Sequence, residues 1–152
     1  MLESEGVLVA SRKAMEQNPT LLAVIKEVLE RLEANLEAKK YYTVTGNMKG
    51  ASAREVADRL LATDGLAGLT GPTVAPVYTK GPDGSAVESP DVFAAVISVP
   101  KDRLYPAVKA IRRAGGSGVL VSPMTYIFDE ETPRWKALLD TLGADAASVP
   151  EL

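Results

Sequence analysis

The sequence lacks two of the residue types on which much enzyme chemistry depends. Its 152 residues include no cysteine and no histidine. Without cysteine there are no disulfides and no thiolate metal sites, a composition compatible with a reducing compartment. Without histidine, the chain alone has no Ser-His-Asp or Cys-His arrangement, no imidazole acid or base, and none of the commonest transition-metal ligand. These absences exclude most familiar catalytic sites from the chain acting by itself.

Long hydrophobic runs and an excess of one charge are also missing. The longest apolar runs, such as residues 92–99, are far too short to span a bilayer. The first residues include Glu3 and Glu5 and lack the basic start and apolar stretch of a signal peptide. The 17 basic and 20 acidic residues are mixed along the chain, so no basic surface is predicted for phosphate backbones. We therefore expect a soluble protein that binds neither membranes nor nucleic acid.

What is present is an ordinary globular composition, with 46% hydrophobic residues, enough for one core and an appendage. Residues 6–11 form a short β-prone run without a partner strand, so they are predicted to be the last strand of a domain that is otherwise missing. Asn18 and Pro19 then provide a cap and a first turn, and apolar residues follow at helical spacing. This pattern predicts a long amphipathic packing or connecting helix over residues 19–39.

The middle of the chain alternates between strand and helix patterns. β-branched and aromatic residues predict strands over residues 41–45, 73–78, 93–99 and 118–122. Ser52 and Glu55 have the spacing of a capping box for one helix, and Asp102 is the predicted cap of a second helix that ends at Gly115. In chain order these elements give β-α-β-β-α-β. We therefore predict an α+β, ferredoxin-like split βαβ fold, with an antiparallel four-stranded sheet and both helices on one face.

A final helix is predicted to begin at Thr132 and Pro133 and to end at Gly143, with Trp135 on its apolar face as a core or interface residue. The predicted organisation is a lead-in region, a connecting helix, a ferredoxin-like domain that includes the final helix, and a tail. Their bounds are residues 1–18, 19–40, 41–143 and 144–152.

Three loops could hold a ligand, but each has a simpler structural explanation. The glycine-rich residues 115–118 end a helix and enter a strand, which favours a helix cap and tight turn over a phosphate loop. Asp64-Gly65 and residues 71–73 have the composition of a ribose-phosphate loop. They lie between a predicted helix and a predicted strand, however, which is the wrong order of elements for such a loop. Acidic residues 129–131 precede the final helix, where carboxylates interact favourably with the helix dipole, and metal binding is the minor alternative. No catalytic and no metal-binding residues are predicted.

Three segments carry a resemblance to a known family. They are TVTGNMKG at residues 43–50, GLTGPTVAP at residues 68–76, and GGSGVLVSPMTYIFDEETPRW at residues 115–135. Together they resemble the C-terminal part of long-form ATP phosphoribosyltransferases, most of all the plant-like branch. The likeness extends from about residue 3 to residue 143, and the last segment is long and irregular enough to be specific.

This resemblance implies an enzyme that joins ATP to phosphoribosyl pyrophosphate in the first step of histidine biosynthesis, uses Mg²⁺, and is feedback-inhibited by histidine. In that family two catalytic subdomains come first, and a ferredoxin-like third domain binds histidine and helps to assemble hexamers. By this likeness residues 1–18 are a remnant of the catalytic region, and the chain alone is non-catalytic and carries no cofactor. The implied partners are L-histidine, the catalytic domains of the same enzyme and further copies of the chain, in a bacterial cytoplasm or a plastid stroma.

The resemblance also places the histidine ligand on three segments of this chain. The matching positions are Asn47, Leu69, Gly71, Thr73, Ser117 and Gly118. We expect their loops to lie together at one edge of the sheet. Bacterial relatives often carry aspartate at the position of Asn47, so a neutral hydrogen bond here replaces an ion pair to the ammonium group of the ligand.

Two other functions remain as alternatives. The chain is a purely structural assembly module of the same enzyme if its pocket is vestigial, an interpretation that the neutral Asn47 and the apolar helix around Trp135 favour. The other alternative is a free-standing amino-acid sensor with the same fold. A measurement of L-histidine binding distinguishes the first alternative, which predicts no binding, from the regulatory function, which requires it.

Overall fold

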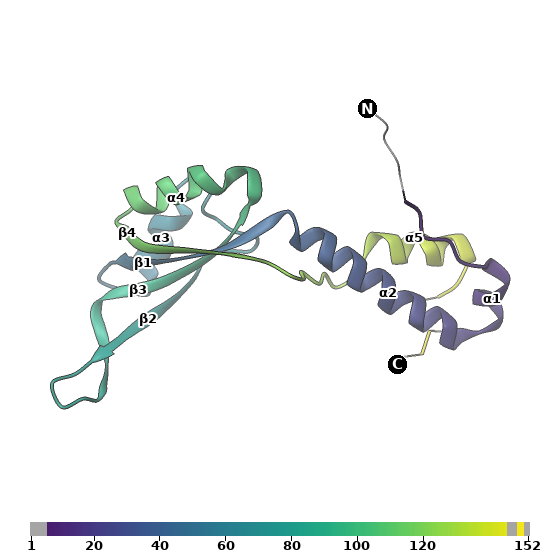
Figure 1. Ribbon diagram of the computed structural model, residues 1–152, viewed down its shortest axis with the longest axis horizontal. Coiled ribbons are helices and arrows are strands. Elements are labelled where there is room, and N and C mark those ends of the chain that lie inside the picture. The colour runs from purple at the N-terminus through teal and green to yellow at the C-terminus, as the bar shows by residue number, and fades with distance from the viewer. Residues whose placement is uncertain (1–5, 146–148, 151–152) are drawn as a thin grey trace. The chain divides into compact units, whose positions relative to one another are not determined.

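The computed structural model describes residues 6–145 and 149–150, and the chain divides into two compact units (Figure 1). The first, which we call the helical unit, comprises Met1–Leu36 and Tyr126–Leu152. The second, the sheet unit, comprises Glu37–Thr125. The ferredoxin-like domain was predicted to reach residue 143, whereas this division assigns the final helix to the helical unit.

The helical unit contains α1 (Arg12–Gln17), α2 (Pro19–Ala38, which continues into the sheet unit) and α5 (Pro133–Leu142). Its core is a cluster of four buried side chains, Met15, Leu22, Trp135 and Leu139. Trp135 is only 3% exposed, which confirms the core role predicted for it. Burial of this apolar face against α2 explains why α5 packs with a helix more than 90 residues earlier in the chain.

The predicted start of α2 and the predicted start and end of α5 are confirmed, whereas α1 was not predicted. The side chain of Asn18 accepts a hydrogen bond of 3.2 Å from the backbone nitrogen of Leu21, which caps α2. Pro133 lies in the first turn of α5, where its missing N–H costs nothing. Gly143 ends that helix with a φ of 66°, a left-handed conformation that glycine adopts without strain.

The two ends of the chain depart from the prediction. Residues 6–10 belong to neither a helix nor a strand, and Ser11 caps α1 by accepting a bond from the backbone nitrogen of Ala14. The expected strand is absent from them because a strand needs a partner backbone, and none of the described strands pairs with these residues. Of the expected tail, Ala144 and Val149 pack against the helical cluster, and residues 146–148 and 151–152 lie outside the described part.

The sheet unit has the predicted ferredoxin-like topology. Its strands are β1 (Tyr41–Lys49), β2 (Thr73–Lys80), β3 (Ala86–Pro100) and β4 (Gly116–Pro123), in the order β2-β3-β1-β4 with all neighbours antiparallel. α3 (Ala53–Leu61) follows β1, and α4 (Leu104–Arg113) follows β3. Figure 1 shows both helices on the same side of the sheet. β2 is an edge strand with a register shift between Pro76 and Tyr78, and proline within sheets is confined to such edges and bulges.

The core of the sheet unit lies between the sheet and these two helices. Successive side chains of a strand point to opposite faces, so alternate residues are buried. The buried set combines both central strands with both helices, and includes Val44, Met48, Ile97, Val99, Val56, Leu60 and Ile111. Thr43, Thr45 and Asn47 alternate with the buried residues of β1 and therefore point to the opposite face, which no described helix of the sheet unit covers.

One helix start was predicted wrongly. Asp102 does not cap α4 but lies in a short 3-10 turn, η1 (Lys101–Arg103), and α4 begins at Leu104. The backbone nitrogen of Lys101 donates to the carbonyl of Lys40 at 2.9 Å, so the chain follows β1 for longer than expected before it turns. No helix in the described part of the chain is long and apolar enough to cross a bilayer.

Candidate ligand site

Three of the six predicted ligand residues lie together where β1 meets β4. Asn47 pairs directly with Ser117, and the register of the two strands shifts between Thr45 and Asn47. This shift is a β-bulge in β4, where Gly118 has a φ of 58°. A Cβ atom on Gly118 would lie 3.7 Å from Nδ2 of Asn47, so the amide of Asn47 borders the bulge. Bulges re-aim side chains, and this one leaves Asn47 beside an exposed backbone turn.

The other three residues lie at the start of β2. Thr73 is the first residue of that strand and pairs with Val96 of β3. Gly71 has a φ of 142° in the preceding loop, and Leu69 is half-exposed there. The loop is tight, because a Cβ atom on Gly68 would lie 3.3 Å from the carbonyl oxygen of Gly71. Glycine at these positions leaves backbone groups accessible along the edge of the sheet.

The prediction that all six residues meet at one edge was wrong for a single chain. β2 and β4 are the two opposite edge strands of the sheet. Three inter-strand spacings separate them, a distance of about 14 Å. Hydrogen bonds join heavy atoms about 3 Å apart, so one amino-acid ligand does not reach the backbones of both Gly71 and Gly118 within one chain. The split βαβ order itself causes this separation, because its central strands are the first and third.

The two groups share one surface, the uncovered face of the sheet, which we call the outer face. Two rows of paired residues cross it, Thr73-Val96-Thr45-Leu120 and Ala75-Ala94-Asn47-Ser117. Neither row contains a charged side chain. The sequence carries a signal for this surface that our prediction missed, since uncharged residues, threonine and alanine among them, occupy the positions of the four strands in these two rows.

A second feature missed from the sequence is the set of bonds made by Arg59. Its Nη1 donates to the carbonyl of Lys49 at 2.9 Å and to the carbonyl of Ala114 at 3.0 Å. Arg59 thereby joins the end of β1 to the segment that enters β4, the two strands that carry Asn47 and Ser117. The spacing of Glu55 and Arg59, four residues apart on a helix, is the only local signal of this arrangement.

Glu55 supports Arg59 and is itself held in its charged form. Oε2 of Glu55 accepts a bond of 2.7 Å from the backbone nitrogen of Ala51, and Oε1 accepts one of 2.5 Å from Nη2 of Arg59. The bond from Ala51, followed by the bond from Arg59, lowers the pKa of Glu55 below its ordinary value of 4.5. The capping box predicted from Ser52 and Glu55 is confirmed by a bond of 3.2 Å from the nitrogen of Glu55 to Oγ of Ser52.

The chemistry available at the candidate site is neutral hydrogen bonding. The amide of Asn47 offers a carbonyl acceptor and two donors, and the hydroxyls of Ser117 and Thr73 donate and accept. Among the described residues there is no group of three or more acidic side chains that could hold a metal ion. The residues gathered here can therefore bind and orient a small polar molecule through neutral hydrogen bonds.

Comparison with known proteins places the fold and the site in a family. The family described as "HisG, C-terminal domain" matches residues 38–126, more than half of the chain. The chain belongs to this family. The matched HisG segment covers all of the sheet unit except its first residue, Glu37, and includes all six predicted ligand residues.

Full-length relatives of this HisG domain agree with the family match. The chain is 54% identical over 143 residues to "ATP phosphoribosyltransferase 1, chloroplastic" of Arabidopsis thaliana, covering 94% of this chain and 34% of that protein. It is 51% identical to the second chloroplastic enzyme of the same plant, with the same coverage, and 27% identical to an ATP phosphoribosyltransferase of Nitrobacter winogradskyi, covering 91% of this chain and 37% of that one. The resemblance to the plant-like branch is thereby confirmed, and the chain spans about a third of the length of these relatives.

Among solved structures, the chain is similar to Arabidopsis thaliana PII bound to citrate. The two share 24% identity with a TM-score of 0.40, over 57% of this chain and 79% of that one. The ferredoxin-like fold of the HisG domain rests on its own strand order and pairing rather than on this similarity.

Proposed function

We propose that this chain is the histidine-binding, regulatory and assembly domain of an ATP phosphoribosyltransferase. The observation that carries the proposal is the grouping of Asn47, Ser117 and Gly118 around a β-bulge on the outer face of the sheet, in a chain of the HisG C-terminal family. The whole enzyme would join ATP to phosphoribosyl pyrophosphate in the first step of histidine biosynthesis with Mg²⁺, and the chloroplastic relatives favour a plastid stroma. This domain would supply no catalytic residue.

In this proposal each group of residues holds a different end of histidine. The amide oxygen of Asn47 accepts from the α-ammonium group, with the hydroxyl of Ser117 beside it. Backbone amides around Gly71 and the hydroxyl of Thr73 donate to the α-carboxylate. Because the two groups lie on opposite edge strands, we infer that the pocket forms between two copies, with β2 of one copy beside β4 of the next.

An assembly of this kind also provides a route to regulation. A ligand shifts a conformational equilibrium only if it binds one state more tightly than the other. Histidine bound between two copies would favour the assembly in which the edge strands meet, and the family hexamer would be the unit that responds. The two uncharged rows of the outer face suit such contacts, because their residues can be covered without burying an unpaired charge.

Complementation between two inactive variants tests this arrangement. We expect L-histidine to give saturable heat in titration calorimetry with the chain, and Asn47→Ala and Thr73→Ala to abolish or strongly reduce it. Co-refolding the two variants together would restore a fraction of the heat, since a Thr73 edge from one variant then meets an Asn47 edge from the other. Thr43→Ala, on the outer face but outside both groups, is the matched control. If the mixture gives no more heat with L-histidine than either variant alone, the shared pocket is contradicted.

The alternative of a purely structural assembly module is favoured by the neutral Asn47 and the apolar helix around Trp135. It predicts that the chain assembles in solution but gives no heat with millimolar L-histidine. Light scattering and calorimetry on the same preparation decide between the two functions. Heat without assembly would instead favour a stand-alone sensor that binds its ligand within one copy.

A further inference from the structure

The strand that carries Ser117 and Gly118 is held by few backbone pairs at the point where it begins. β4 is an edge strand, so β1 is its only neighbour among the described strands. Gly116 pairs with Met48 and Ser117 pairs with Asn47, and the register then shifts at the bulge. Because so little of the ladder lies before the bulge, pairing alone fixes the position of Gly118 relative to Asn47 poorly.

Arg59 of α3 supplies further contacts at this point. Its Nη1 donates to the carbonyl of Lys49 at 2.9 Å and to the carbonyl of Ala114 at 3.0 Å. These two residues follow Met48 in β1 and precede Gly116 of β4, so the guanidinium bridges the two strands just beyond their last pair. Hydrogen bonds from a charged donor are roughly twice as strong as neutral ones, so this bridge adds substantially to the pairing.

Arg59 and the segment it holds have little freedom to move. Nη2 of Arg59 donates to Oε1 of Glu55 at 2.5 Å, and Oε2 of Glu55 accepts from the backbone nitrogen of Ala51 at 2.7 Å. On the other side, a Cβ atom on Gly116 would lie only 2.4 Å from Cγ2 of Ile111, so the start of β4 already touches α4. The entry to β4 is therefore fixed by the guanidinium and by packing together.

We propose that Arg59 is a positioning residue of the ligand site, which fixes the bulge at Gly118 relative to Asn47. The proposal rests on the function proposed above and adds a residue that the family resemblance did not indicate. α3 packs on the face of the sheet opposite to the outer face, where Asn47 points, so Arg59 acts on the ligand through the backbone of β4. Arg59 is not among the side chains that fill the core of the sheet unit, so its loss should change the site more than the fold.

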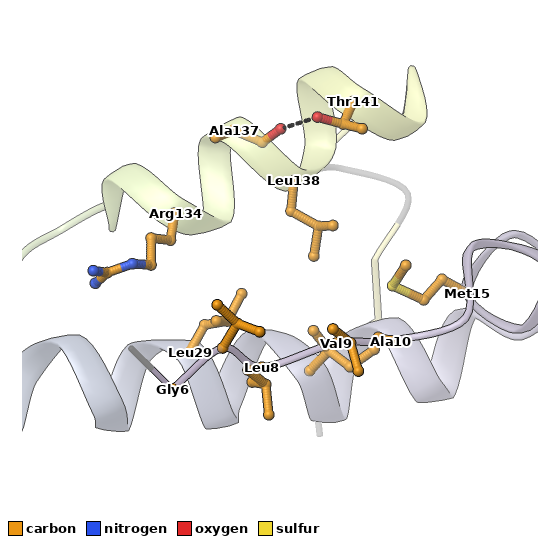
Figure 2. A pocket seen from close by; sticks show the side chains of 12 residues that line it. Gly6, Leu8, Val9, Ala10, Met15, Leu29, Arg134, Ala137, Leu138 and Thr141 are labelled. Atoms are coloured by element: carbon orange, nitrogen blue, oxygen red, sulfur yellow. Dashed lines mark hydrogen bonds between the residues drawn. The ribbon is translucent and has the colours of Figure 1, made fainter. Parts of the chain in front are cut away.

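The surroundings of Arg59 are open to small ions. A cavity of about 400 Å³ has Arg59 and Ala114 among its lining residues. No described residue lines both this cavity and the larger, mainly aliphatic cavity of the helical unit (Figure 2). Removal of the Arg59 side chain would therefore expose the carbonyl of Ala114 to solvent, where a free guanidinium ion can supply the missing N–H donors.

Titration calorimetry with L-histidine tests the effect on the ligand. Arg59→Ala should raise the Kd roughly tenfold, because the charged donors that hold the entry to β4 are lost. Low-millimolar guanidinium chloride should restore part of the affinity, whereas sodium chloride at the same ionic strength should not. Arg54→Ala, at an exposed arginine of the same helix, is the matched control and should leave the Kd unchanged. An unchanged Kd in Arg59→Ala overturns the proposal, and so does equal recovery with both salts.

Arg59→Lys provides a second variant in case Arg59→Ala does not fold. It keeps the positive charge and most of the side chain, but a single ammonium group lacks the planar fork that bridges two carbonyls and a carboxylate. Its Kd for L-histidine should therefore lie above that of the unsubstituted chain, with the same far-UV circular dichroism. A Kd equal to that of the unsubstituted chain would overturn the proposal.

Nuclear magnetic resonance of the unliganded chain keeps the test independent of histidine binding. A Cβ atom on Gly118 would lie 3.7 Å from Nδ2 of Asn47, and an α-proton of Gly118 occupies that direction. The nuclear Overhauser effect between this proton and the side-chain amide of Asn47 should be strong in the unsubstituted chain and in Arg54→Ala. It should weaken in Arg59→Ala and recover with guanidinium chloride. An effect of equal strength in all of these samples overturns the proposal, whereas the expected changes without histidine heat in any sample would contradict only the function proposed above.

Discussion

At the scale of single residues, Asn47 is the residue whose proposed contact with the ligand, a hydrogen bond to the ammonium group, is most open to test. Its side chain points from the outer face beside the bulge at Gly118, and it pairs with Ser117 across the strands. The sequence alone indicated these three residues only through the family resemblance, because an asparagine after a β-prone run is also an ordinary turn residue. The bulge that gives Asn47 its surroundings depends on the pairing of β1 with β4.

A carboxylate at this position should strengthen histidine binding. We expect Asn47→Asp to tighten binding by roughly 1 kcal/mol, about fivefold in Kd, because a charge-assisted bond to the ammonium group is stronger than a neutral one. Titration calorimetry at neutral pH measures the change. Asn47→Leu, which keeps the volume and removes the polar atoms, should abolish binding. An unchanged or weaker Kd for Asn47→Asp would show that Asn47 does not face the ammonium group.

Gly116 is required for packing, which its sequence context did not reveal. A Cβ atom there would lie 2.4 Å from Cγ2 of Ile111, 2.8 Å from the carbonyl oxygen of Ile111 and 2.8 Å from Sδ of Met48. We expect Gly116→Ala to destabilise the fold by about 1–3 kcal/mol, the usual cost of overpacking a core. Urea denaturation followed by far-UV circular dichroism measures this, with Gly6→Ala as the control, because no atom lies within 4 Å of its Cβ position. Equal stability of the two variants would contradict the packing argument.

At the scale of elements, local patterns predicted most helices and strands, since caps and periodicity act over a few residues. The capping box at Ser52 and the prolines and glycine that bound α2 and α5 lie where they were predicted. Residues 6–10 and Asp102 did not follow their patterns. A strand requires a partner, and the start of α4 depends on a bond between Lys101 and Lys40, 61 positions apart in the sequence. Local propensity contains neither piece of information.

The pKa of Glu55 predicts a pH dependence for α3. Because its bonds to Ala51 and Arg59 lower the folded-state pKa below 4.5, the stability it contributes is present above that value and is lost as the pH falls through the lowered pKa. Glu55→Gln should therefore be less stable at neutral pH and should lose less stability on acidification below about pH 4.5. Urea midpoints at a series of pH values measure both effects. Asp58→Asn on the same helix is the matched control, and parallel profiles for Glu55→Gln and the unsubstituted chain would contradict the assignment.

At the scale of the whole molecule, two separate hydrophobic clusters divide the chain, one in the helical unit and one in the sheet unit. The only tryptophan, Trp135, lies in the helical cluster, so its fluorescence reports on that unit alone. The family resemblance predicted the HisG C-terminal domain correctly. The predicted domain extends to residue 143, whereas the division by contacts ends the sheet unit at Thr125.

Substitutions in the two clusters should have separate effects. We expect Leu139→Ala to lower the stability of the helical unit by about 2–5 kcal/mol, seen as an earlier fluorescence transition in urea. Val99→Ala in the sheet cluster should leave the fluorescence transition in place and move the far-UV circular dichroism transition instead. Transitions that move together for both variants would show that the units unfold as one cooperative body.

The sequence by itself determined most of the helices and strands, the β-α-β-β-α-β order and the family, because these depend on local periodicity, on caps and on motifs that can be found along the chain. Only the tertiary structure decided that α5 belongs to the helical unit, and that the predicted ligand residues are divided between the two edges of the sheet. Trp135 buries its side chain beside Leu22, and the strand order sends Thr73 and Ser117 to opposite edges of the sheet. Both outcomes follow from packing and pairing between residues far apart in the chain, which no local pattern encodes.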